Sequence, residues 1–101
     1  MADFLGSNLK FLVEPSASGF DKSRDNFTVT ISSQKKSRTW EKVDLILDQQ
    51  GNYYVPVDTA FFGTGIYLIT VKTYTPDDDF DGGIRVGIEQ MELCNILTLR
   101  Q

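Results

Sequence analysis

The strongest constraint on the fold of this chain is an alternation of apolar and polar side chains with a period of two residues. Phe27, Val29 and Ile31 are separated by threonines, which is the pattern of a strand with one buried face. Strand-like segments also cover residues 9–13, 39–43 (which 45–47 extend or flank), 53–57, 66–74 and 84–99. No segment has apolar residues at helical spacing, so the sequence predicts an all-β protein.

The residues between the fourth and fifth of these segments predict a short crossover. Asp58 or Thr59 can cap a single helical turn, and Gly63 can end it. Phe61 or Phe62 would then fold onto the core as a lid.

Two strands carry irregular features. Gly51 is placed for a positive φ angle in the tight turn "DQQGN". Pro56 lacks a backbone donor, which predicts an edge strand or a strand end. In the last strand the apolar residues change phase between Ile88 and Met91. A regular strand cannot do this, so a bulge is predicted near Glu89–Gln90.

About seven short antiparallel strands in 101 residues predict a single β-sandwich domain over residues 1–101. Two aromatic residues indicate that this sandwich is immunoglobulin-like. Tyr67 begins a strand just after the crossover, as in a tyrosine corner, and Trp40 lies one strand after the clearest alternating segment, where such domains bury an indole. The usual cysteine pair is missing, and Val29 and Ile69 are expected in its place.

Composition excludes several classes of function. The net charge is −4, and with no broad basic face the chain is not expected to bind nucleic acid. No apolar segment is long enough to span a membrane, no secretory signal is evident, and the single cysteine, Cys94, suits a reducing compartment or a particle assembled in one. Histidine is absent, so no catalytic triad can form. We therefore expect a protein without enzymatic activity and without a cofactor.

The acidic segment "TPDDDFDGGIR" contains the candidate metal ligands Asp77, Asp79 and Asp81. With Gly82 they match the first half of a calcium-binding loop. The twelfth position of such a loop should be a bidentate glutamate, but here it is Ile88. The segment is therefore predicted to be an exposed hairpin tip without a high-affinity metal site. Its charge would keep the tip soluble or guide a partner.

The segment 66–74 is apolar on both faces, which is more than one sandwich core requires. Tyr67, Ile69 and Val71 occupy one face, whereas Ile66, Leu68 and Tyr74 occupy the other. Either the chain's own loops and termini ("MADFLG" or "LTLRQ") cover the second face, or a second copy or a larger assembly does. The candidate interface consists of Ile66, Leu68 and Tyr74 with the last strand beside them. The basic turn with Lys35, Lys36 and Arg38 is either solvated or a partner for the acidic loop of a neighbouring molecule.

Several motifs together resemble one family. The segments are "DFLGSNLKF", "NFTVTI", "TWEKVDL", "GNYYVPVDT", "GTGIY" and "DFDGGIR". They resemble the head-fibre dimer proteins of crAss-like phages that infect gut Bacteroidales, over nearly the whole chain. The motifs are turn and core signatures, so the resemblance transfers no catalytic or binding residue.

The resemblance implies an immunoglobulin-like domain that self-associates as a dimer on the exterior of a virion. It would be assembled in the bacterial cytoplasm and would contact other fibre or capsid proteins. Two alternatives remain open. One is a carbohydrate-binding or adhesion module with a calcium-assisted loop and with Tyr53, Tyr54 or Tyr74 stacking on sugars. The other is an intracellular scaffold domain of a bacterial host.

Overall fold

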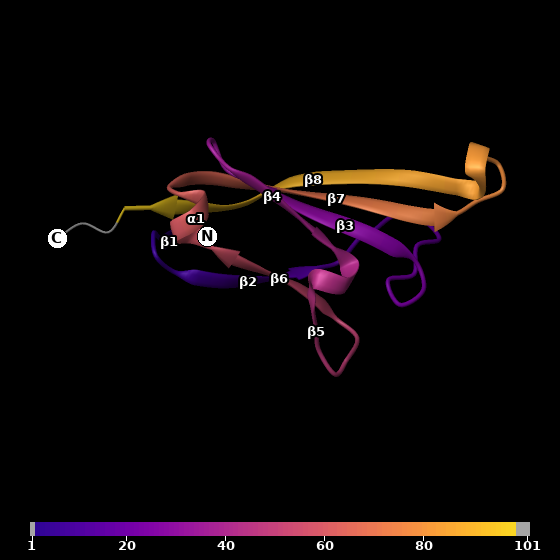
Figure 1. Cartoon of the computed structure of the whole chain (residues 1–101), viewed down its shortest axis with the longest axis horizontal. Coiled ribbons are helices and arrows are strands. Elements are labelled where there is room, and N and C mark those ends of the chain that lie inside the picture. The colour runs from indigo at the N-terminus through magenta and orange to yellow at the C-terminus, as the bar shows by residue number, and fades with distance from the viewer. Residues whose placement is uncertain (1, 99–101) are drawn as a thin grey trace.

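The computed structural model describes residues 2–98 and confirms an all-β sandwich (Figure 1). Its eight strands are β1 (Ala2–Phe4), β2 (Asn8–Val13), β3 (Asn26–Ser32), β4 (Ser37–Glu41), β5 (Ile46–Leu47), β6 (Tyr53–Asp58), β7 (Gly65–Pro76) and β8 (Ile84–Leu97). One helical turn, α1 (Thr59–Phe62), and two 3-10 turns, η1 (Lys42–Asp44) and η2 (Asp81–Gly83), complete the described elements.

The strands form two sheets with the immunoglobulin arrangement. One sheet has the order β1-β8-β7-β3-β4 and the other has the order β2-β6-β5. The second sheet corresponds to immunoglobulin strands B, E and D, and β8, β7, β3 and β4 correspond to G, F, C and C′. The sequence did not predict β1, which pairs in parallel with residues 95–97 of β8. This pair departs from the purely antiparallel sheets that were expected.

The predicted core residues lie between the two sheets. Phe27, Val29 and Ile31 on β3 are fully buried, as are Val55 on β6 and Tyr67 on β7. The alternation on β3 therefore reports its buried face correctly, because its threonines point to the outer side of the sheet.

Two positional expectations were wrong. Trp40 is buried, with 5% of its surface exposed, but it lies on the outer strand β4, and β3 takes the place of the strand that buries the immunoglobulin indole. Val29 and Ile69 do not face each other across the sandwich. Both belong to the five-stranded sheet, where Val29 lies opposite Val71.

The predicted crossover is confirmed. The Asp58 carboxylate accepts a hydrogen bond from the Ala60 amide at 3.0 Å and caps α1. Gly63 ends the turn with a φ of 87°, a conformation that glycine adopts without strain. Phe62 is the buried lid, whereas Phe61 is exposed.

The tyrosine corner is also confirmed. The Tyr67 hydroxyl lies 2.5 Å from the Gly63 carbonyl oxygen, to which it donates, and 3.4 Å from that of Thr59. Burial raises the pKa of the Tyr67 hydroxyl to about 12, so the group remains a protonated donor at neutral pH. It thereby ties the crossover backbone to the start of β7.

Pro56 does not lie on an edge strand, because β6 is the central strand of its sheet. However, β5 pairs only with Tyr53 and Tyr54. At Pro56 the strand therefore has β2 on one side and no ladder partner on the other, so the missing donor is tolerated there.

The bulge in β8 occurs later than predicted. The register between β7 and β8 shifts where Tyr67 pairs with Cys94 and Leu68 pairs with Glu92, which leaves Leu93 as the extra residue. At Glu89–Gln90 the pairing is regular. The phase change in the sequence has another cause: Val86 and Ile88 lie on the outer face of β8, whereas Met91 lies on its core-facing side.

The β7–β8 hairpin is the longest feature of a molecule that measures 57 × 30 × 19 Å. In Figure 1 its orange tip projects beyond the three-stranded sheet. The segment 14–25 crosses the inner face of this projecting part. There Ser16 donates from its amide (2.9 Å) and its hydroxyl (2.6 Å) to the Glu89 carboxylate, and Arg85 donates to the Ser18 carbonyl. This loop takes the place of a second sheet at that end.

Candidate functional site

The outer face of β7 and β8 carries the candidate interface. Ile66, Leu68 and Tyr74 all lie on this face, as the alternation predicted. Ile66 and Leu68 are 45% and 36% exposed, and Tyr74 is half-buried. Tyr74 lies six residues beyond Leu68, a separation of about 20 Å along a strand. The three residues therefore share a face but do not form one cluster.

The structure identifies which residues of the last strand join this face. Val86 lies opposite Tyr74, Ile88 lies opposite Lys72, and Ile84 lies opposite Pro76. Directly paired residues point to the same side of a sheet. Ile84, Val86 and Ile88 are 40%, 53% and 64% exposed, and with Tyr74 they form an apolar cluster near the hairpin tip.

The outer apolar surface is thus divided into two parts. We define the proximal cluster as Ile66 and Leu68, and the distal cluster as Tyr74, Ile84, Val86 and Ile88. A polar band separates them, in which the Gln90 side-chain amide donates to the Thr70 hydroxyl at 2.9 Å. The sequence contained a signal for the distal cluster. The alternation of Val86 and Ile88 is out of phase with that of Met91 and Leu93, so the two pairs point to opposite faces of β8.

Neither described terminus covers this surface. β1 extends the edge of the sheet beside the end of β8 and does not lie over its face. The other expected cover was "LTLRQ", of which residues 99–101 lie outside the described residues.

The acidic segment is an exposed hairpin tip, as predicted. The Asp77 amide donates to the Gly83 carbonyl at 2.9 Å and closes the loop. The Asp77 carboxylate accepts from the Asp79 amide at 3.0 Å and lies 3.6 Å from the Arg85 guanidinium. Asp79 and Asp81 are exposed. Within residues 2–98, no three acidic or cysteine side chains come together in a manner suited to a metal ion.

The three tyrosines considered for sugar stacking lie on different surfaces. Tyr53 packs edge-on against the core residue Phe27, with ring centroids 5.3 Å apart. Tyr54 lies on the outer face of the three-stranded sheet under the Lys10 ammonium, and Tyr74 lies on the outer face of the opposite sheet. They do not form a shared platform, so the calcium-assisted carbohydrate module gains no support from this geometry.

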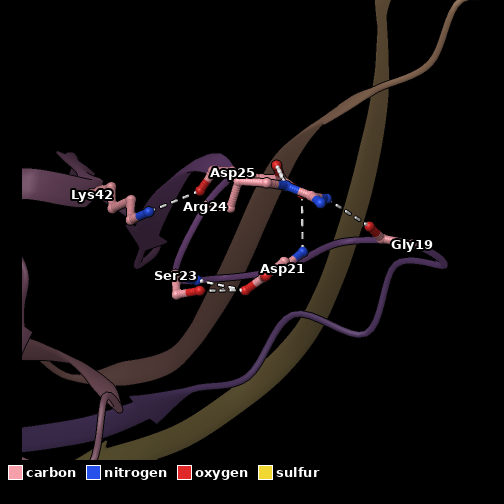
Figure 2. A network of polar contacts seen from close by, with 6 residues as sticks. All are labelled: Gly19, Asp21, Ser23, Arg24, Asp25 and Lys42. Carbon is pink, nitrogen blue, oxygen red and sulfur yellow. Dashed lines mark hydrogen bonds and ion pairs between the residues drawn. The ribbon is translucent and has the colours of Figure 1, made fainter.

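Sequence reasoning missed a polar network in the segment 19–25 (Figure 2). The Asp25 carboxylate is buried and accepts from the Arg24 guanidinium at 2.7 and 2.9 Å. The Asp25 backbone carbonyl accepts from the Lys42 ammonium at 2.9 Å. The Arg24 guanidinium also reaches the Gly19 carbonyl at 3.3 Å. This network fixes the loop that covers the projecting hairpin.

The same network contains a local turn. The Asp21 amide donates to the Asp25 carboxylate at 2.9 Å, and the Asp21 carboxylate accepts from the amide and the hydroxyl of Ser23. Aspartate side chains often bond the backbone two residues further on. The spacing D-x-S-x-D was the only local signal for it in the sequence.

The network predicts an acid-dependent loss of stability. Hydrogen bonds from Arg24 lower the pKa of the Asp25 carboxyl to about 2 from its ordinary 3.8. Because the folded-state pKa is depressed, this contribution to stability is fully present above about pH 4 and is lost as the pH falls through about 2. Asp25→Asn should therefore destabilise the fold at neutral pH, and its difference from the natural chain should shrink between about pH 4 and pH 2.

Urea unfolding at a series of pH values measures this difference. Asp78→Asn, at the exposed hairpin tip, is the control and should have little effect at any pH. A difference between Asp25→Asn and the natural chain that stays constant down to about pH 2 would show that the carboxylate charge is not the cause.

The environment of the single cysteine disfavours a nucleophilic thiolate. The Cys94 side chain is buried, and burial raises the pKa of its thiol, which disfavours the reactive thiolate. The chain contains no histidine that could act as a base.

No model of a known protein family matches the chain, and comparisons with curated proteins and with solved structures give no significant match. In residues 2–98 no helix has the length and apolarity needed to cross a membrane.

Proposed function

We propose that this chain is a non-enzymatic structural protein that forms a symmetric dimer through the outer face of β7 and β8. The observation that carries the proposal is the exposure of the proximal and distal clusters on strands whose inner face already serves the core. An apolar sheet face of this kind in a soluble domain is typical of an interaction surface.

A two-fold dimer would match the layout of this face. Ser32 lies beside Leu68 and Asn26 lies beside Tyr74, so the basic turn after β3 and the acidic tip after β7 are at opposite ends of the sheet. Antiparallel packing of two copies places the proximal cluster of each on the distal cluster of the other. It also brings the turn with Lys35 and Lys36 towards the partner's acidic tip. One patch used twice closes the assembly.

The place of such a dimer would be the head fibre of a phage or a similar appendage on the virion exterior, beside other fibre or capsid proteins. The resemblance of the turn and core motifs to crAss-like phage head-fibre proteins supports this part of the proposal. The calcium-assisted module and the bacterial scaffold are not favoured by any contact in the described chain.

Light scattering of the purified chain near 10 μM tests the dimer, whose interface should bury about 1,200 Å² or more in total if it is stable. We expect a dimer for the natural chain and a folded monomer for Leu68→Glu. Ile46→Glu is the matched control, since Ile46 is 40% exposed beside Tyr54 in the other sheet and lies outside the proposed interface. It should remain a dimer.

Two results would contradict this proposal. A monomeric natural chain would remove the dimer, and a dimer that survives Leu68→Glu would place the interface elsewhere.

Added salt should weaken the antiparallel dimer, because the turn and the acidic tip attract across the interface and salt screens exposed charges. A dimer that is indifferent to salt would overturn the antiparallel arrangement but not the dimer.

A further inference from the structure

The open side of the sandwich between β2 and β8 contains an apolar groove. Its volume is about 240 Å³. We call it the β2–β8 groove, and its lining consists of Leu12, Val13, Glu14, Pro15, Ile69, Val71, Glu89, Met91 and Leu93. Ile69 and Val71, on β7, form part of the buried core, so the groove reaches the core itself.

Both strands beside the groove have an unpaired edge in the described structure. β2 pairs only with β6. β8 pairs with β7 along its length, but β1 covers its other edge only at residues 95–97. In an immunoglobulin sandwich this side is closed by the first strand, which here is the three-residue β1. The position beside β2 is vacant.

Met91 shows that the core is incomplete at this point. It lies opposite Ile69, which points into the sandwich, so Met91 is on the core-facing side of β8. Nevertheless, 62% of its surface is exposed, whereas Ile69 is 6% exposed. The exposure arises because no strand of the opposite sheet lies over this part of β8.

The ionisable groups in the lining have one sign. They are Glu14, which is exposed, and Glu89, whose carboxylate Ser16 holds in place. The lining contains no lysine or arginine. An occupant that carries a basic side chain therefore complements the groove.

We propose that the β2–β8 groove binds an extended segment of another polypeptide as an added β-strand. Its alternate side chains are apolar and fill the space over Ile69, Val71 and Met91, and a lysine or arginine on it pairs with the acidic lining. Only a peptide backbone supplies donors and acceptors along the unpaired edge of β2 or β8, which is the general basis of strand addition. The site lies on the opposite side of β8 from the proposed dimer face, so the two can be tested separately.

A displayed library of random peptides of about ten residues, the upper end of ordinary strand length, is the probe. Selection on the purified natural chain should enrich peptides with alternating apolar residues and at least one basic residue. For a synthetic copy of the leading peptide, binding should protect backbone amides of β2 or β8 from hydrogen exchange, because these amides become paired.

Two variants that add the same charge locate the peptide. Met91→Glu places a like charge in the groove, and Val43→Glu makes the same change in η1, where Val43 is 88% exposed and belongs to neither the groove nor the proposed dimer face. We expect Met91→Glu to weaken binding at least about tenfold and Val43→Glu to leave it unchanged. N-methylation of alternate peptide amides should abolish binding without altering the protein, because it removes backbone donors.

The proposal fails if selection enriches no peptide, if the selected peptides bind Met91→Glu as tightly as the natural chain, or if N-methylation has no effect. Loss of peptide binding in Val43→Glu but not in Met91→Glu would place the peptide away from the groove. That outcome would overturn the groove while leaving the dimer to be judged by light scattering.

Discussion

Replacement of Phe27 by alanine should lower the free energy of unfolding by about 3–5 kcal/mol. The Phe27 side chain is fully buried on β3, between the loop residue Phe20 and Tyr53 of the opposite sheet, with ring centroids 5.7 and 5.3 Å away. Its removal leaves a cavity between three parts of the chain that cannot all close in. A loss of this size approaches the whole stability of a small domain.

Urea unfolding followed by circular dichroism measures this effect. Phe80→Ala is the matched control, because Phe80 is 51% exposed at the hairpin tip, and it should change stability by less than about 0.5 kcal/mol. Similar losses for the two variants would show that the ring of Phe27 does not join the two sheets and the loop.

A methyl group at Gly87 should cost about 1–3 kcal/mol. A Cβ atom there would lie 2.6 Å from the Thr73 hydroxyl oxygen and 3.5 Å from the Ala17 side chain. The φ angle of Gly87 is not in the left-handed region, so the cost is steric and does not come from the backbone. Gly87→Ala should therefore force the Thr73 side chain, and the part of β7 that carries it, to shift.

The second substitution Thr73→Ala separates this clash from other causes. In the described chain the Thr73 hydroxyl is buried without a hydrogen-bond partner, so its loss removes both the clashing atom and an unsatisfied polar group. The double variant should be more stable than the sum of the two single effects predicts, by about 1 kcal/mol or more. Additive effects in urea unfolding would mean that the added methyl group meets a different obstacle.

Local features of the sequence were sufficient to predict the local structure. The alternation around Val29 gave a strand and its buried face, because side chains on a strand point alternately to opposite sides. Asp58 and Gly63 predicted the ends of α1, since capping depends on the chemistry of single residues. Tyr67 predicted the corner, because its hydroxyl reaches backbone only four residues away.

Pairing between strands could not be read in this way. Trp40 was expected on the strand that buries the immunoglobulin indole, but β3 takes that place and Trp40 lies on its neighbour β4. Alternation does not state which strands are neighbours. The short β1 has no signal of its own in the sequence. The bulge at Leu93 depends on how β8 meets Tyr67 and Leu68 of β7. The bond from Ser16 to Glu89 joins residues 73 positions apart, which no local pattern records.

The same distinction between local pattern and tertiary structure applies to the two proposed binding surfaces. The sequence by itself determined that Ile66, Leu68 and Tyr74 share the outer face of β7, because that follows from a period of two. Only the tertiary structure decided that Val86 and Ile88 extend this face and that Met91 is uncovered. Whether an inward side chain is buried depends on how far the opposite sheet extends, and that extent is set by contacts between residues far apart in the chain.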